Sequence, residues 1–177
     1  MQVLDVIRSR RSIRAYADMP VEQAKTDRIL EAARLAPSAA NRQAWRFIVV
    51  TDRQRRRALA AAAMGQDFVA EAPLVIVACA APGEHHLLYE KLSYAIDVTV
   101  ALTHMTLQAV AEGLGTCWVT GFYEDQVRRV LSIPNQVRVV QMLTVGYPAG
   151  PPRPLCRKPL DELVHWETWS DRVQPVR

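Results

Sequence analysis

The chain has 177 residues, half of them hydrophobic, and a formal net charge of +4 at pH 7. This length and composition predict a single domain, residues 1–177, with its own hydrophobic core. The apolar run at residues 74–81 is too short to cross a bilayer, and the N-terminus lacks a basic-then-apolar signal, so we expect a cytoplasmic protein without a membrane partner.

Apolar periodicity and breaks at proline and glycine divide the chain into alternating helices and strands. In chain order we expect a helix at residues 4–9, a helix at 21–35, a strand at 45–51, a helix at 54–64, a strand at 74–79, a helix from about 86 to 112, a strand at 116–120, a helix at 124–131 and a strand at 137–147. The Pro-rich stretch at residues 148–154 predicts a loop or an arm, because it cannot form regular structure.

The long helix is apolar or small on nearly every side at residues 95–111. Such a helix is buried all round, either in a large core or partly against a second subunit. In a chain this small, the second subunit is the more attractive explanation. The tail beyond residue 154 carries Trp166 and Trp169, and exposed tryptophans also favour a partner surface.

Cysteine and histidine usage argues against a disulfide framework and a metal site. The three cysteines are an odd number without CxxC spacing, which indicates reduced thiols. The histidines are either adjacent, as at His85 and His86, or isolated, as at His104 and His165. Neither arrangement has the spacing of a metal-binding motif, so no metal is expected.

Residues 10–14, Arg-Arg-Ser-Ile-Arg, place three guanidinium groups and one hydroxyl within five residues. This donor set suits a bound phosphate, because a guanidinium group is always charged and its planar fork matches phosphate oxygens. The alternative is a solvated basic helix end, where cations are favourable near the C-terminus without any ligand. On spacing alone the second explanation is the more common one.

Two further segments have two explanations each. The small side chains at residues 38–41 allow a backbone to approach a flat or bulky group, but they also suit an ordinary helix-to-strand connection. Residues 53–57, Arg-Gln-Arg-Arg-Arg, are the best candidate for contact with nucleic acid. Because they open an Ala-rich helix, we interpret them as a solvated face and expect no nucleic-acid partner.

Five segments, each weak by itself, form a specific combination in this order. They are residues 10–14 (Arg-Arg-Ser-Ile-Arg), 36–47 (Ala-Pro-Ser-Ala-Ala-Asn-Arg-Gln-Ala-Trp-Arg-Phe), 72–77 (Ala-Pro-Leu-Val-Ile-Val), 112–118 (Glu-Gly-Leu-Gly-Thr-Cys-Trp) and 144–148 (Thr-Val-Gly-Tyr-Pro). Together they resemble the nitroreductase family of FMN-dependent flavoproteins, and the resemblance covers nearly the whole chain. It favours the phosphate explanation for the Arg cluster.

The resemblance implies an α+β fold, with a central, mainly antiparallel sheet flanked by helices. It also implies an intertwined homodimer with two FMN sites at the subunit interface. The C-terminal arm, from about residue 148 to residue 177, would then pack on the partner subunit.

The resemblance also implies which residues contact FMN. By position, Arg10, Arg11 and Ser12 would bind the phosphate and ribityl chain. Arg14 would reach the N1/O2 edge of the isoalloxazine ring, and Arg157 would return to the phosphate. A positive group near N1/O2 stabilises the reduced flavin.

The remaining implied contacts come from two other parts of the chain. The loop residues contributed by the other subunit would be Pro37, Ser38, Ala39 and Asn41. The residues beside the ring would be Met64, Gln66, Thr120 and Gly121, the last two through backbone groups near N5. No side-chain acid or base is needed for catalysis, because flavin N5 is the reactive centre.

Two departures from the family pattern affect the loop. Related sequences often have Pro at the position of Ala44, and Gly or Ser where this chain has Ala39 and Ala40. The shape of the loop is therefore open. Arg42 in the same loop is either solvated, which we favour, or meets an anionic substrate.

The expected function is transfer of electrons from NADH or NADPH, through FMN, to a nitroaromatic, quinone or related small-molecule acceptor by a ping-pong mechanism. One alternative is a specialised member of the family, such as an ene reductase, a ring dehydrogenase or a flavin-fragmenting enzyme. A remote alternative is an Arg-rich nucleic-acid-binding protein without a cofactor.

Overall fold

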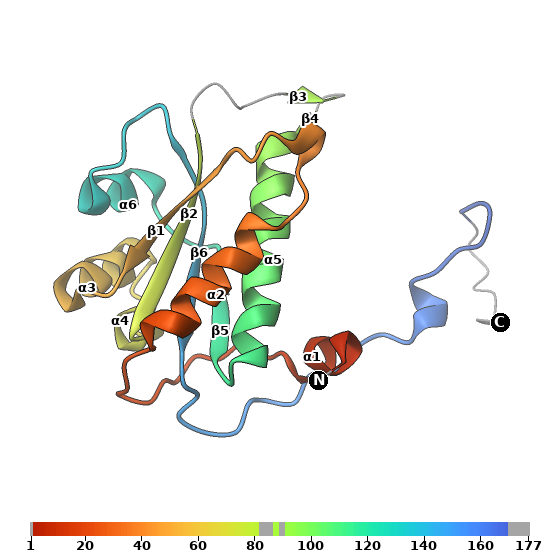
Figure 1. The fold of residues 1–177 in the computed structure, drawn as a ribbon, viewed down its shortest axis with the longest axis horizontal. Coiled ribbons are helices and arrows are strands. Elements are labelled where there is room, and N and C mark those ends of the chain that lie inside the picture. Colours follow the sequence, from red (N-terminus) through yellow and green to blue (C-terminus); the bar gives the residue numbers. More distant parts are fainter. Residues whose placement is uncertain (1, 82–86, 89–90, 170–177) are drawn as a thin grey trace.

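The computed structural model describes residues 2–81, 87–88 and 91–169 (Figure 1). Its helices are α1 (Val3–Ser9), α2 (Gln23–Arg34), α3 (Arg53–Ala62), α4 (Phe68–Glu71), α5 (Ser93–Ala111) and α6 (Glu124–Leu131), with 3-10 turns at Ala39–Asn41 and Leu160–Glu162. Its strands are β1 (Trp45–Val50), β2 (Leu74–Ala80), β3 (Leu87–Leu88), β4 (Lys91–Leu92), β5 (Gly115–Val119) and β6 (Arg138–Gly146). Among these residues, no helix combines the length and apolar character needed to cross a membrane.

The centre of the fold is a four-stranded sheet in the order β1-β2-β6-β5, and every neighbouring pair is antiparallel. Helices α2 and α5 lie side by side on one face of this sheet, and α3 and α6 cover the other (Figure 1). The predicted α+β architecture, an antiparallel sheet flanked by helices, is therefore confirmed.

Strand β2 is buried along its whole length because it lies between both helical layers. Successive side chains of a strand point to opposite faces. Accordingly, Leu74 and Ile76 belong to the core on the α2 and α5 side, whereas Val75 and Val77 belong to the core on the α3 and α6 side. This double burial explains why the strand is a continuous apolar run rather than an alternating one.

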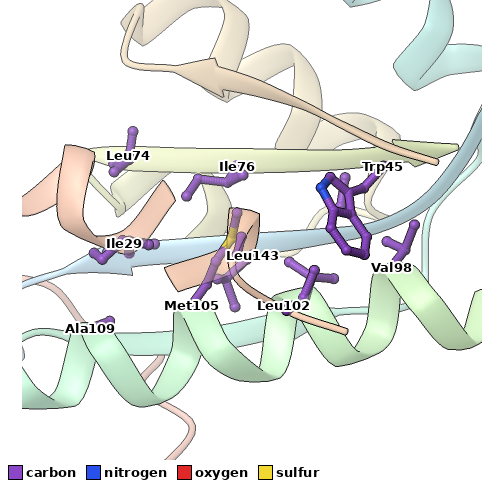
Figure 2. Packing of buried hydrophobic residues seen from close by; sticks show 14 of the residues in the cluster. Ile29, Trp45, Leu74, Ile76, Val98, Leu102, Met105, Ala109 and Leu143 are labelled. Carbon is purple, nitrogen blue, oxygen red and sulfur yellow. The ribbon is translucent and has the colours of Figure 1, made fainter. Parts of the chain in front are cut away.

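One face of α5 packs on the sheet (Figure 2). Val98, Leu102, Met105 and Ala109 recur at helical spacing and are fully buried. Fully burying a side chain of the size of Val, Leu or Met stabilises the fold by about 1.5–3 kcal/mol. The opposite face is different, since Ile96 remains 53% exposed. The predicted all-round burial of this helix is thus not achieved within one chain.

The start of the long helix is a correction to the sequence prediction. We expected the helix to begin near His86, but Leu87–Leu88 and Lys91–Leu92 pair as the short antiparallel strands β3 and β4, and α5 begins at Ser93. A short apolar run fits either period, so the sequence pattern could not separate strand from helix here. His85 and His86 lie outside the described residues.

The extended segment at residues 12–17 connects α1 to the sheet. The Ile13 N–H donates to the Thr116 carbonyl of β5 at 2.9 Å, and the Ala17 N–H donates to the Tyr147 carbonyl after β6 at 2.9 Å. Gly115 allows this approach, because a Cβ at that position would overlap the Ile13 side chain. The segment that carries the Arg cluster is therefore held on two sides.

We predict that Gly115→Ala lowers the free energy of unfolding by about 1–3 kcal/mol, which is typical of overpacking. Gly150→Ala is the matched control, since nothing lies within 4 Å of a Cβ there. Urea unfolding of both variants and the parent chain tests this. Equal midpoints for the two variants would contradict the close approach of Ile13 to β5.

Candidate active site

Arg10 and Arg157, far apart in the sequence, are near enough for their charges to interact. Burial lowers the pKa of Arg10, and the positive charges of Arg157 and then Arg11 lower it further. In the described part of the chain, none of these three side chains forms a salt bridge. Like charges without a counter-ion repel each other, so a bound anion would stabilise this cluster.

Arg11 also serves the end of α1. Its Nη1 donates to the Arg8 carbonyl at 2.6 Å and to the Arg10 carbonyl at 2.9 Å. These contacts are those of a basic side chain at a helix C-terminus, the alternative explanation that the sequence allowed. That Arg11 also binds phosphate, through its other guanidinium nitrogen atoms, stays a prediction.

Ser12 and Arg14 continue from this cluster towards α4. Ser12 pairs with Thr116 of β5 and is exposed. The guanidinium carbon of Arg14 lies 5.9 Å from the centroid of the Phe68 ring, within the range of a cation–π contact. Phe68 thus positions Arg14 beside the turn that precedes α4.

That turn meets the end of β5. Gln66 Nε2 donates to the Gly121 carbonyl at 3.1 Å, and the Met64 methyl group would lie 3.4 Å from a Cβ on Gly121. Thr120 Oγ1 accepts from Nε2 of the buried Gln141 at 2.9 Å. The structure therefore brings all four residues predicted beside the ring into one neighbourhood.

The loop at residues 37–41 lies in a different part of the structure. The Ala39 N–H donates to Oδ1 of the buried Asp97 at 3.0 Å, near the start of α5. The Arg cluster lies near the other end of this 19-residue helix (Figure 1), which at 1.5 Å per residue is about 28 Å long. One chain therefore does not bring the loop and the Arg cluster together.

The same loop has an unusual backbone. Ala40, Asn41 and Gln43 all have φ near +50°, a left-handed conformation that side chains other than glycine rarely adopt. Ser38 Oγ accepts from the Gln43 N–H at 3.0 Å and helps to hold this shape. Such strain persists only where surrounding contacts fix it, and it concentrates at functional sites.

Arg42 differs from the expectation of a solvated side chain. It is half-buried, and its Nη1 is buried without a hydrogen-bond acceptor among the described residues. A buried guanidinium nitrogen without an acceptor is unfavourable. Burial of this nitrogen depends on tertiary packing, which the sequence pattern does not reveal.

The buried thiols are poor nucleophiles. Burial raises the pKa of Cys79 to about 11, and burial also raises the pKa of Cys117 although Arg14 and Arg10 act in the opposite direction. A protonated thiol does not attack an electrophile at neutral pH. Cys156 is exposed.

Sequence reasoning missed two residues of this neighbourhood. Phe68 gave no signal beyond being an aromatic residue after a turn. Gln141 did give one, because a polar side chain interrupts the β-branched run of β6 and is buried there.

The sequence model of the nitroreductase family matches residues 7–94 and 61–147, which together span most of the chain. The chain belongs to the nitroreductase family. The resemblance of the five segments is thereby confirmed.

Curated relatives and solved structures agree with this assignment. The chain is 35% identical over 188 residues to an NADH dehydrogenase of Thermus thermophilus, covering 89% of this chain and 92% of the relative. It is 29% identical over 188 residues to a Bacillus subtilis protein named FMN reductase, covering 97% of this chain and 76% of the relative. A crystal structure of a nitroreductase family protein from Clostridium difficile matches with a TM-score of 0.86 at 32% identity, covering 96% of this chain and 100% of the other.

We predict that inorganic phosphate stabilises the protein after bound small molecules have been removed, and that Arg10→Ala abolishes most of this effect. The reason is that the phosphate neutralises the repulsion between Arg10 and Arg157. Melting temperatures in phosphate and in chloride of equal ionic strength test this. Arg57→Ala, which removes an exposed charge from α3, should respond like the parent chain, and an equal response of Arg10→Ala would contradict the anion site.

Proposed function

We propose that this protein transfers electrons from NADH or NADPH, through FMN, to a nitroaromatic, quinone or related small-molecule acceptor. Membership of the nitroreductase family makes it an NAD(P)H-dependent oxidoreductase that uses FMN. The observation that carries our assignment of the site is the Arg10 and Arg157 pair, which lacks a carboxylate counter-ion in the described part of the chain. The choice of acceptors rests on the family.

The phosphate end of the site is proposed at Arg10, Arg157, Ser12 and Arg11. These residues fit the cofactor, since charge-assisted hydrogen bonds from guanidinium groups contribute about 1.5–3 kcal/mol each. Three such contacts would contribute about 4.5–9 kcal/mol, and micromolar affinity takes about 8 kcal/mol, so the arginines could hold the phosphate end but could not by themselves give tight retention. Burial of the ring must supply the rest.

The ring end is proposed at Arg14, with Met64, Gln66, Thr120 and Gly121 around it. Bound FMN supplies a centre, N5, that accepts and donates hydride. Arg14 would place a positive charge beside the ring edge, where it would stabilise added negative charge. The Gln66 bond to the Gly121 carbonyl keeps the turn against the end of β5, so the pocket wall is preformed.

We further propose a homodimer whose second subunit supplies Pro37, Ser38, Ala39 and Asn41. Support comes from the separation of this loop from the Arg cluster within one chain. Exposed apolar side chains of α1 and α5, and one at the end of α2, supply a second argument: they are Val3, Leu4, Ile7, Ile96 and Leu35. A groove of about 500 Å³ runs between these helices, lined by residues that include Val6, Ala32 and Leu107.

The C-terminal arm, from about residue 148 to residue 177, is proposed to pack on the same partner. Residues 148–163 are all exposed, and the arm leaves the body of the molecule beyond α1 (Figure 1). Trp169 is 81% exposed and stacks on His165 with ring centroids 4.2 Å apart. Large apolar groups in this position favour burial against another surface.

The proposed homodimer can be tested by its mass in solution. Sedimentation at micromolar concentration should give about twice the chain mass of 19.9 kDa. Replacing Ile96 by Asp should shift the protein towards monomer and lower its flavin content, because the second half of the site is lost. A monomer that keeps a full complement of flavin would contradict the shared site.

The proposed ping-pong mechanism can be tested by steady-state kinetics. If one pocket serves the nicotinamide donor and the acceptor in turn, initial-rate plots against donor at several acceptor concentrations should be parallel. Anaerobic NADH or NADPH should bleach the visible flavin band, and a quinone or nitroaromatic should restore it. Arg14→Ala should make the flavin harder to reduce and leave most of its binding intact.

Other outcomes separate the alternatives. Intersecting lines would indicate a ternary complex and a separate donor site. A bound flavin that neither donor reduces would favour a specialised member of the family. A protein purified without any flavin, and unable to bind FMN, would overturn the proposal as a whole.

A further inference from the structure

A pocket of about 300 Å³ lies where α2 begins, β1 ends and β2 begins. Small-molecule sites occupy about 300–1,000 Å³, so this pocket suits a compact ligand. None of its lining residues belongs to the proposed flavin site, to the C-terminal arm or to the apolar surface assigned to the partner subunit. The pocket is therefore separate from the site described above.

Arg56 of α3 contributes a fixed positive charge to this pocket. Its Nε donates to the Thr51 carbonyl at 3.2 Å, and its Nη1 donates to the carbonyls of Ala70, at 2.6 Å, and Ala72. Within the described residues, Nη2 has no acceptor and no carboxylate lies within salt-bridge distance of this side chain. The guanidinium group is thus held in place by neutral carbonyls and keeps N–H groups for a further acceptor.

Two carboxylates line the same pocket, Asp18 before α2 and Glu71 at the end of α4. Both side chains are exposed, and neither forms a salt bridge in the part of the chain that the structure describes. Burial lowers the pKa of Arg56, whereas the charge of Asp18 acts in the opposite direction. The pocket therefore contains charges of both signs that interact through space without pairing directly.

Apolar side chains form another part of the lining. Met19 is 51% exposed and Val49 is 39% exposed, and Val21 and Leu74 lie beside the same space. Contact with an apolar group of a ligand would remove such side chains from water, which is favourable. A ligand that suits this pocket therefore has an apolar part as well as charges.

We propose that this pocket binds a small zwitterion, namely an α-amino acid with an apolar side chain. The carboxylate of the ligand accepts from Arg56 Nη2, and its ammonium group donates to Asp18 and Glu71. A simple anion would be repelled by the two carboxylates and a simple cation by the guanidinium group, so a ligand with both charges fits best. The apolar side chain of the ligand lies against Met19 and Val49.

The test measures equilibrium binding to the full-length protein as purified, by calorimetry. The probes are L-leucine, 4-methylpentanoate, which has the same skeleton without the ammonium group, and 3-methylbutylamine, which lacks the carboxylate. L-leucine should bind, and each analogue should bind about tenfold more weakly, because one charge-assisted contact at a partly exposed position is lost. L-alanine is included as a smaller amino acid.

Two variants locate the site, and a third serves as the matched control. Asp18→Asn and Glu71→Gln should each weaken binding of L-leucine about three- to tenfold, as expected for an exposed, screened contact. Asp125→Asn removes an exposed carboxylate from α6, outside the pocket, and should bind L-leucine like the parent chain. Melting temperatures show whether each variant is folded, and the comparison of probes on the parent chain needs no variant.

The proposal is overturned if neither L-leucine nor L-alanine binds, or if Asp18→Asn and Glu71→Gln both match Asp125→Asn. Equal binding of 3-methylbutylamine and L-leucine would indicate a cation site instead, and equal binding of 4-methylpentanoate would indicate an anion site. None of these measurements uses catalytic activity. Failure of this proposal can therefore be distinguished from failure of the proposed function.

Discussion

The pairing of residues 12–17 with the edge of the sheet is the interaction on which the site depends. Ile13 is bonded to β5, and Ala15 and Ala17 are bonded to the segment that follows β6. This double attachment places Arg10, at the end of α1, beside the chain that leads into the C-terminal arm. These backbone hydrogen bonds and the close contact of Ile13 with Gly115 hold the segment that follows Arg10 and Arg11, although the charges of these two residues repel each other.

The same arrangement leaves charge and apolar surface without partners in one chain. Stable proteins usually pair buried charge and cover large apolar side chains. Here the described structure has an Arg cluster without carboxylates, a strained loop that includes Ala40, and helices α1 and α5 with apolar faces in water. Each of these features is unfavourable by itself. A bound anionic cofactor and a second subunit would satisfy all three, which is why the site and the assembly are best considered together.

The ordered polar contacts at the end of β5 have a different role. Gln141 holds Thr120, and Gln66 holds Gly121, so two strands and one turn converge on a short stretch of backbone. Side-chain amides are suited to this because each has donors and an acceptor and carries no charge. The neighbourhood of a reactive flavin would then be rigid while the outer arm remains free to pack elsewhere.

Much of the fold was predictable from the sequence. The strands at 45–51, 74–79, 116–120 and 137–147 and the helix at 124–131 agree with β1, β2, β5, β6 and α6 to within about two residues, because local periodicity and turn residues determine where an element begins and ends. The short strands β3 and β4 escaped prediction because their pairing, rather than their composition, makes them strands. The segments that carry the family resemblance also gave the candidate site residues in advance.

Tertiary structure alone decided which of those residues meet. The closeness of Arg157 to Arg10, the contact of Arg14 with Phe68 and the bond from Gln66 to Gly121 join parts of the chain far apart in sequence. The same holds for the separation of the loop at residues 37–41 from the Arg cluster. The sequence by itself determined the donor types and the order of the elements, since both are local properties. The distances between donors depend on how the helices pack on the sheet, and that packing is set by the whole chain at once.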